Sequence, residues 1–262
     1  MSVVRVLFIG DIVGKPGRRA VRENLATLFQ SEDFDLVIAN GENAAGGFGL
    51  TNDVVEELFS LGVDVITTGN HVWDKKEGVA LVGENERILR PFNFPPGTPG
   101  KGAGIYTGKS GYRYLVANFI GRVFMGNYDC PFRGADDMVT RMRDSADFAI
   151  LDFHGEATSE KEAFGFYLDG RVSAVVGTHT HVQTADERIL PGGTGYITDV
   201  GMCGPLNSVI GMKRELILQR FLLSMPVRFE VASGPVIFSA VVLSLDGETG
   251  LCRSVERIYD VR

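Results

Sequence analysis

The sequence is poor in cysteine. Of its 262 residues only three are cysteines, Cys130, Cys203 and Cys252, and they are widely spaced with no Cys-x-x-Cys pair. We therefore expect no disulfide framework, no cysteine-based structural zinc site and no redox motif. A reducing compartment is the simplest location for such a chain, so we predict a cytoplasmic protein.

Long apolar runs and an excess of positive charge are also missing. The apolar run near the N-terminus, residues 3–9, is too short for a signal peptide, and no stretch is long enough to span a bilayer. The formal net charge is −7, so the chain as a whole does not attract nucleic acid or an anionic membrane. We expect no membrane association and no duplex DNA binding, although a local basic patch is compatible with this charge.

What the chain does have is the composition of a protein with a full hydrophobic core. Hydrophobic residues make up 44% of it, which is ordinary for a globular domain. Its length suits one domain of the larger α/β or sandwich type. We therefore expect residues 1–262 to form a single domain.

The first third of the chain alternates between strand and helix patterns. Residues 3–9, 34–39 and 63–68 are mostly apolar with little alternation, which is typical of strands buried on both faces. A helical pattern follows Pro16, and Thr51 is expected to cap a second helix. This order predicts parallel strands whose carboxyl ends lie at one edge of a sheet.

The rest of the chain predicts two hairpins and further helices. Residues 104–107 and 112–119 favour one antiparallel pair, and residues 236–245 and 251–259 favour another. Helical patterns cover residues 135–143, 160–168 and 212–223. We expect the last of these helices to be amphipathic.

Histidine is scarce, but its copies share one context. Each of the four stands at or just after an apolar, strand-like run: His71, His154, His179 and His181. A single histidine is more often a satisfied core or surface residue than a ligand. A shared position at strand ends, where side chains enter the mouth of a cleft, favours a metal site instead.

Acidic and amide side chains occupy the same position after the other predicted strands. They are Asp11, Glu42, Asn43 and Asn70. Carboxylates, imidazoles and amide oxygens together suit a pair of cations such as Mn, Fe, Co or Zn. One carboxylate can bridge two ions about 3.5–4 Å apart and hold a hydroxide between them. A dinuclear metal site is therefore predicted.

In their order, these motifs resemble those of the calcineurin-like metallophosphoesterases. That pattern runs Asp-x-His, Gly-Asp, Gly-Asn-His-Asp/Glu, His and Gly-His-x-His. The chain departs from it where Asp11-Ile12-Val13 lacks a histidine and where Gly41-Glu42 replaces Gly-Asp. Both departures, together with residues 69–74 and 177–184, look like the bacterial YmdB-like branch. The resemblance covers nearly the whole chain and implies an α/β fold, a four-layer αββα sandwich of mixed sheets with helices outside.

The resemblance also implies a role for each residue of the site. One ion would be held by Asp11, Glu42, Asn43 and His181, and the other by Glu42, Asn70, His154 and His179. Asn43 would replace the missing histidine of Asp-x-His. His71 is similar to the family's catalytic histidine, which protonates the leaving oxygen or steadies phosphoryl charge. From the residues alone, Asp11 could instead cap the helix near Pro16, and Asn43 could be only a turn residue.

Members of the YmdB-like branch are described as phosphodiesterases acting on 2′,3′-cyclic nucleotides. The implied reaction is in-line attack of a metal-bridging hydroxide on the cyclic phosphate, with His71 assisting departure of the 2′ oxygen, so that a 3′-nucleotide remains. The implied cofactors are two divalent or trivalent ions per chain, Fe or Mn, with Zn or Co as alternatives. The implied substrate is a small cyclic nucleotide or an RNA-end phosphodiester, and the chain could form homo-oligomers.

Other functions stay open at this point. One is a regulatory protein that binds a nucleotide or RNA with little turnover, and another is a broader phosphodiesterase or phosphomonoesterase. Metal-dependent turnover would separate an enzyme from a binding protein. An amide-cutting metallohydrolase is disfavoured, because amidohydrolase barrels carry His-x-His early and metallo-β-lactamase-like sites need His-x-His-x-Asp-His, which residues 179–184 lack.

Several residues near these motifs keep two interpretations. Phe48, within the glycine-rich segment 46–49, and Phe132 could stack on a base or belong to the core. Arg133 and Arg141 could bind phosphate or be solvated surface charges.

Overall fold

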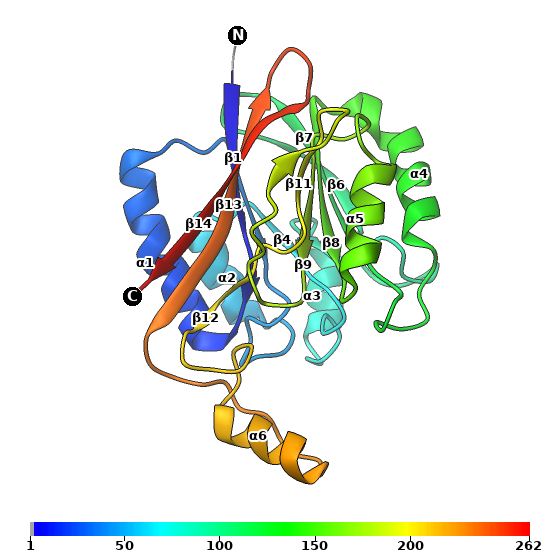
Figure 1. The fold of residues 1–262 in the computed structure, drawn as a ribbon. Coiled ribbons are helices and arrows are strands. Elements are labelled where there is room, and N and C mark those ends of the chain that lie inside the picture. The colour runs from blue at the N-terminus through cyan, green and yellow to red at the C-terminus, as the bar shows by residue number, and fades with distance from the viewer. Residues whose placement is uncertain (1–2) are drawn as a thin grey trace.

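Two β-sheets pack face to face, and helices cover both outer faces (Figure 1). The computed structural model describes residues 3–262. The first sheet contains β1 (Val3–Ile9), β2 (Asp11–Ile12), β3 (Leu36–Asn40), β4 (Val65–Thr67), β5 (Ile88–Leu89), β12 (Met202–Pro205), β13 (Val236–Asp246) and β14 (Cys252–Val261). The strand order is β2-β12-β13-β1-β3-β4-β5, and β14 pairs with β13.

The parallel strands predicted in the first third of the chain are confirmed. β1, β3, β4 and β5 run parallel to one another. The predicted hairpin at the end of the chain is also confirmed, since β13 and β14 pair antiparallel. β13 pairs antiparallel with β1 as well, which makes the first sheet mixed.

The second sheet is mixed in the same way. It contains β6 (Ala103–Thr107), β7 (Arg113–Ile120), β8 (Phe148–His154), β9 (Ala174–Thr178), β10 (Arg188–Ile189) and β11 (Gly195–Ile197), in the order β10-β11-β9-β8-β7-β6. The predicted antiparallel pair is β6 and β7. The strands β7, β8, β9 and β11 are parallel, so their carboxyl ends meet at one end of the molecule.

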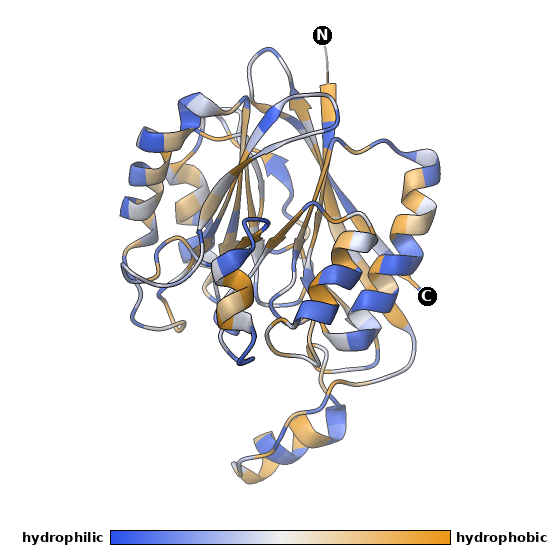
Figure 2. Ribbon diagram, turned by 180° about the vertical axis from the view of Figure 1, so that it is seen from behind, coloured by the Kyte–Doolittle hydropathy of each residue, from blue (hydrophilic) through white to orange (hydrophobic). Residues whose placement is uncertain are grey.

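The apolar runs of the sequence fill three layers of core. In β1, Val6 and Phe8 face the second sheet, whereas Leu7 and Ile9 face the helices, because successive side chains of a strand point to opposite faces. The helices α1 (Gly14–Ser31) and α2 (Asn52–Ser60) cover the first sheet, and α4 (Pro131–Met142) and α5 (Thr158–Tyr167) cover the second. The αββα order of layers is therefore confirmed, and Figure 2 shows the strands as the most apolar part of the molecule.

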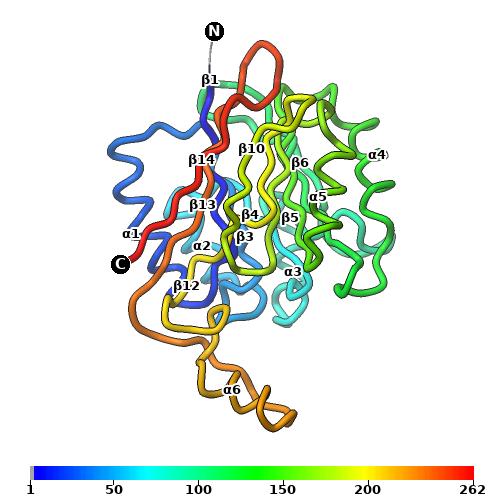
Figure 3. The backbone as a smooth tube through the Cα atoms, viewed as in Figure 1, coloured from blue at the N-terminus to red at the C-terminus, as the bar shows by residue number. Residues whose placement is uncertain are grey.

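The last helix, α6 (Arg214–Leu223), differs from the prediction. We expected an amphipathic helix, but only Ile217 of α6 is buried, whereas Leu218, Phe221 and Leu222 are exposed. Figures 1 and 3 show α6 at the end of an arm that extends away from the sheets. The two sides of the arm are joined where Lys213 donates its backbone N–H to the carbonyl of Glu230 at 2.9 Å.

Smaller features complete the fold. The short helix α3 (Gly78–Glu84) lies between β4 and β5. Thr51 stands at the N-cap of α2 as predicted, but its side chain makes no capping hydrogen bond. Within residues 3–262 no helix is both long and apolar enough to cross a membrane.

Candidate metal centre

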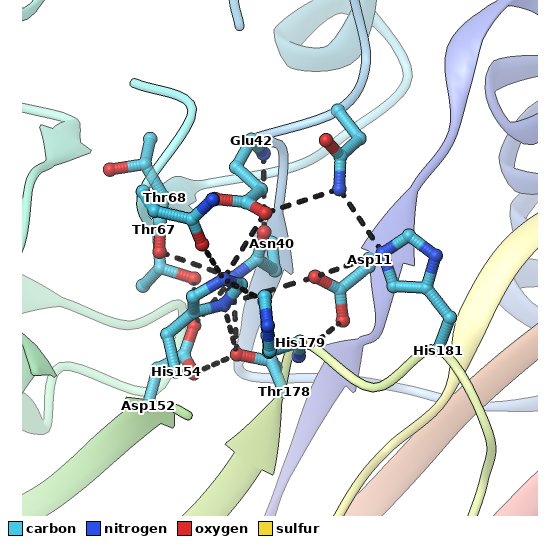
Figure 4. Close-up of polar contacts among 12 residues, drawn as sticks. Asp11, Asn40, Glu42, Thr67, Thr68, Asp152, His154, Thr178, His179 and His181 are labelled. Atoms are coloured by element: carbon cyan, nitrogen blue, oxygen red, sulfur yellow. Dashed lines mark hydrogen bonds and ion pairs between the residues drawn. The ribbon is translucent and has the colours of Figure 1, made fainter. Parts of the chain in front are cut away.

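The predicted site residues gather where the carboxyl ends of the two sheets meet (Figure 4). The register explains why: Ile120, His154 and Thr178 lie side by side at the ends of β7, β8 and β9. The first sheet brings its own strand ends against them. At Gly69 a Cβ would lie 2.1 Å from Glu42 Oε2 and 2.3 Å from His154 Nε2, so only glycine allows this approach.

Four predicted ligands surround one point. The Nε2 atom of His154 lies 3.1 Å from Glu42 Oε1, 3.2 Å from Asn70 Oδ1 and 3.0 Å from His179 Nδ1. One ring nitrogen carries at most one proton, which cannot satisfy a carboxylate, an amide oxygen and a second imidazole together. A cation among these atoms would satisfy all of them, so the donor set fits a metal ion.

A second group of predicted ligands lies beside the first. Asn43 Nδ2 lies 3.1 Å from His181 Nε2 and 3.2 Å from Glu42 Oε1. His181 Nε2 is 3.8 Å from Asp11 Oδ1. The amide of Asn43 presents its nitrogen to this group, so coordination through Oδ1 requires a half-turn of the amide. Glu42 contacts both groups, as a bridging carboxylate would.

Asp11 provides the clearest test of whether a cation fits. Its carboxylate is fully buried, and Oδ2 accepts the backbone N–H of His179 at 3.2 Å. Within residues 3–262, Oδ1 has no hydrogen-bond partner. A buried carboxylate oxygen without a partner is costly, and a bound cation removes that cost. Asp11 does not cap α1, whose N-cap is Val13 without a side-chain hydrogen bond, so the capping alternative is wrong.

The electrostatics show how the same groups share charge without a cation. Burial raises the pKa of Asp11 to about 7. Burial opposes the charged form of Glu42 too, but attraction to His154 and a hydrogen bond with it outweigh that and hold the pKa of Glu42 at about 2. The same pairing raises the pKa of His154 to about 9 against the effect of burial. Burial and the neighbouring His154 lower the pKa of His179 to about 3.

A buried network behind His154 fixes its ring. His154 Nδ1 lies 2.8 Å from Thr178 Oγ1, and that hydroxyl donates to Asp152 Oδ1 at 2.7 Å. Asn40 and Thr67 donate to the other oxygen of Asp152 (Figure 4). Since Nδ1 is held from behind, Nε2 faces the other ligands, which is how metal-binding histidines are usually oriented. We did not predict Asp152, although it lies two residues before His154 and so on the same face of β8.

The turn that carries the last two histidines is strained. His179 has φ of 100° and His181 has φ of 66°, in the left-handed region that side chains other than glycine avoid. Strain of this kind persists only when the surroundings hold it. His181 is held in part by the carbonyl of Ile210, which lies 2.9 Å from its Nδ1.

A buried ion pair supports this turn. Lys161 Nζ donates to Asp199 Oδ2 and to the carbonyl of Thr178, both at 2.7 Å. Asp199 Oδ2 also accepts the backbone N–H of Thr180 at 3.0 Å and its hydroxyl at 2.8 Å. Lys161 and Asp199 are at most 1% exposed, and neither was predicted. They tie α5 to the segment between the two histidines.

The side chain of His71 lies outside both groups of predicted ligands, although its backbone N–H donates to Glu42 Oε2 at 3.3 Å. Its side chain is 31% exposed, and Nδ1 lies 2.9 Å from Asp74 Oδ2. The ring of Phe48 meets it edge to face, with ring centroids 5.0 Å apart. Because Nδ1 is held by Asp74, Nε2 is left to meet a substrate. Phe132 is partly buried and packs against Phe164 at the edge of the core, which favours a structural role.

Comparisons with known proteins find relatives that match almost the whole chain. A protein of Bacillus subtilis (strain 168) named 2′,3′-cyclic-nucleotide 2′-phosphodiesterase is 50% identical over 255 residues, which is 97% of this chain and 96% of the relative. The crystal structure of a hypothetical protein from Thermus thermophilus matches with a TM-score of 0.93 and 46% identity, covering 99% of this chain and 100% of the other.

A second solved structure and a family model extend the match. The crystal structure of a phosphatase from Mycoplasma pneumoniae has a TM-score of 0.94 and 36% identity, and it covers 100% of this chain and 94% of the other. The model of the family described as YmdB-like protein matches residues 7–258. The family model and these relatives lead to one assignment: the chain belongs to the YmdB-like family.

Proposed function

We propose that this protein is a metal-dependent phosphodiesterase that hydrolyses 2′,3′-cyclic nucleotides to 3′-nucleotides. The observation that carries the proposal is the unpartnered Oδ1 of buried Asp11 beside a cluster of imidazole, carboxylate and amide groups. The Bacillus subtilis relative, named for this activity, supports the substrate.

We propose two metal ions, Fe or Mn, in this cluster. Asp11, Glu42, Asn43 and His181 would hold one, and Glu42, Asn70, His154 and His179 the other. When bound, such ions neutralise phosphoryl charge and lower the pKa of water, so that a nucleophile exists at neutral pH. The close contacts among these side chains support the grouping, because each set contains groups that already lie next to one another.

The chain's own residues orient and protonate. Asp152 and Thr178 hold the ring of His154, and Asp74 holds His71 with Nε2 toward the mouth of the site. As water adds to phosphorus and the bond to the 2′ oxygen breaks, the leaving oxygen needs a proton. We assign that proton to Nε2 of His71, since His71 follows the ligand Asn70 directly and stands outside both ligand groups.

We also propose a cytoplasmic location and a single domain. Cys130, Cys203 and Cys252 are all unpaired thiols, which favours a reducing compartment. The strands of each sheet come from distant parts of the chain, with β13 beside β1, which favours one folding unit over residues 1–262.

The test combines metal analysis with a substrate panel. Protein purified without chelator is expected to hold two ions per chain and to convert 2′,3′-cyclic AMP to 3′-AMP faster than it converts 3′,5′-cyclic AMP or a phosphomonoester. Removal of the ions should abolish turnover, and Mn²⁺ or Fe²⁺ should restore it. Stoichiometric nucleotide binding without product would contradict the proposal and favour a regulatory binding protein instead.

A further inference from the structure

A cationic cavity lies beside the first turns of α1. It has a volume of about 410 Å³ and lies between the start of α1, α2 and the turn at residues 233–234. Its charged lining residues are Lys15, Arg18, Arg19, Arg22 and Glu57. Four cations therefore face one carboxylate, in a chain whose formal net charge is −7. This is the local basic patch that the overall charge left open.

The arginines of the cavity are already ordered. Arg18 donates to Glu57 Oε2 and to the carbonyl of Ala44, both at 2.6 Å, and Arg22 donates to the other oxygen of Glu57. Arg19 donates to the carbonyl of Gly234 at 2.6 Å. A guanidinium has five N–H donors, so these contacts leave donors over, and the side chains lose little further freedom when an anion binds.

Lys15 is the lining residue whose positive charge is most available to a bound anion. It is exposed, and within residues 3–262 its ammonium group has neither an ion-pair nor a hydrogen-bond partner. Arg19 is also exposed; it donates to Gly234, and its ion pair with Glu23 is long, at 3.9 Å. An anion in this cavity would meet one cation without a partner and a second whose ion pair is exposed and weak.

The cavity and the metal centre share a wall. The carbonyl of Asn43, a proposed ligand, accepts the backbone N–H of Gly14, and the carbonyl of the next residue, Ala44, accepts from Arg18. Beyond this wall, Gly46 is exposed and has open space where a side chain would stand. The backbone of residues 43–44 therefore separates the cavity from the predicted ligands, and the exposed glycine that follows leaves room for a bound chain.

The chemistry of the proposed substrate suggests what that chain is. A 2′,3′-cyclic phosphate forms when the 2′-hydroxyl of a ribonucleotide attacks the adjoining phosphorus and displaces the next nucleotide. The reaction leaves the cyclic phosphate at the 3′ end of an RNA strand whose upstream phosphates are intact. Each of those phosphates carries a negative charge that lysine and arginine bind well.

We propose that the cationic cavity binds a backbone phosphate of an oligoribonucleotide whose 2′,3′-cyclic phosphate end lies at the metal centre. This inference rests on the proposed function and deepens it: the substrates include the ends of short RNA strands as well as mononucleotides. The reaction class that supplies them is RNA cleavage through the 2′-hydroxyl.

The experiment compares two substrates, 2′,3′-cyclic AMP and an adenosine tetranucleotide that ends in a 2′,3′-cyclic phosphate. For the metal-loaded protein we expect kcat/KM to be about tenfold higher for the tetranucleotide, with a steeper dependence on salt. In Lys15→Glu/Arg19→Glu the advantage should vanish, while kcat/KM for the mononucleotide stays within about twofold. A wild-type protein without preference, or a variant that loses both activities equally, would overturn the proposal.

Controls separate the cavity from general charge and from folding. Lys109→Glu makes the same change of charge as Lys15→Glu alone, but in the turn between β6 and β7 at the opposite end of the strands, and should change neither activity. If the double variant fails to fold, Lys15→Glu alone replaces it, because Lys15 holds no other residue in place and its loss should not affect folding. This single variant should lose part of the tetranucleotide preference. No loss in that variant contradicts the proposal.

The outcome also distinguishes this inference from the proposed function. If the metal-loaded protein hydrolyses neither substrate, the proposed function fails. Binding of a fluorescent tetranucleotide with a 3′-phosphate then tests the cavity by itself. Binding that Lys15→Glu/Arg19→Glu weakens about tenfold and Lys109→Glu leaves unchanged supports the cavity, whereas equal binding by all three proteins overturns it.

Discussion

Two buried aspartates at the same end of the molecule differ in how their oxygens are satisfied. Both Asp11 and Asp199 are 0% exposed. Asp199 Oδ2 accepts from Lys161 and twice from Thr180, and Oδ1 accepts the backbone N–H of Gly201 at 2.8 Å. Asp11 Oδ1 has no hydrogen-bond partner within residues 3–262, and its nearest imidazole nitrogen is 3.8 Å away. Both oxygens of Asp199 are therefore satisfied by hydrogen bonds, whereas Asp11 lacks a partner, and the groups around it are suited to bind a cation.

This difference separates a predicted metal ligand from a side chain that holds other residues in place. Burial and position at a strand end do not distinguish the two aspartates, but the count of hydrogen-bond donors does. Asp199 uses its carboxylate to hold Lys161 and the strained turn between His179 and His181. The Oδ1 atom of Asp11 has no such partner within residues 3–262, so it is available to a bound cation. Removing either carboxylate should therefore have opposite consequences for stability and for metal content.

The sharpest test of the comparison is Asp11→Asn. We expect the metal content to fall by about one ion per chain and turnover to fall by about a thousandfold or more, because a metal ion supplies several kcal/mol of transition-state stabilisation. The metal-free variant should melt no lower than metal-free wild type, since the substitution removes a buried carboxylate oxygen that has no partner. Metal analysis, kinetics and thermal melting check this. A variant with full metal content, or one that melts markedly lower, would mean that Asp11 is a support like Asp199.

His71→Ala tests a residue that is neither a predicted metal ligand nor a buried residue that supports the site. His71 is neither a buried support nor among the proposed ligands, so the metal content should stay near that of wild type. Turnover of 2′,3′-cyclic AMP should fall by about 10²–10⁴-fold, the usual contribution of a general acid. Unchanged turnover would rule out its assigned role, and lost metal would place it among the ligands.

Lys161→Met tests the other side of the comparison. Removing one partner of a buried ion pair leaves the other charge uncompensated, so the free energy of unfolding should fall by about 3–5 kcal/mol. The turn at Thr180 loses an anchor, and metal retention during dialysis should weaken. The matched control is Arg171→Met, which breaks a surface pair of the same length, 2.7 Å, with Asp136. That variant should lose at most about 1 kcal/mol. Equal losses in the two variants would contradict a special role for Lys161.

The position of the site could be predicted because topology determines it. Mostly apolar runs marked the parallel strands, and the residues after each run were expected to meet at one edge. Glu42, Asn70, His154 and His179 do meet, within contact of one another. Their roles as ligands, and that of His71 in catalysis, stay predictions. Two sheets rather than one supply them, which the strand pattern alone did not reveal.

The supports could not be predicted in the same way. Lys161 belongs to a helical pattern, and a lysine is almost always solvent-exposed, so nothing in the pattern pointed to a buried pair with a residue 38 positions away. Asp152 was within reach, because strand periodicity places it on the same face as His154. For α6 the pattern contains apolar residues but not what they contact, and the helix extends into solvent instead of packing on the sheets.

The smallest effect that we predict concerns protons. In the metal-free protein the pKa of His154 is about 9 and that of Asp11 about 7. Each of the two ions must displace one of these protons. The apparent affinity for the ion held by His154 should therefore fall about tenfold for each pH unit below 9, and that for the ion held by Asp11 about tenfold for each pH unit below 7. Calorimetric titrations with Mn²⁺ in buffers of different ionisation enthalpy measure the protons released. In Asp11→Asn the proton release that begins below pH 7 should disappear, while that of His154 remains. If the affinity for the metal ion does not change with pH below 7, Asp11 does not lose a proton when the ion binds.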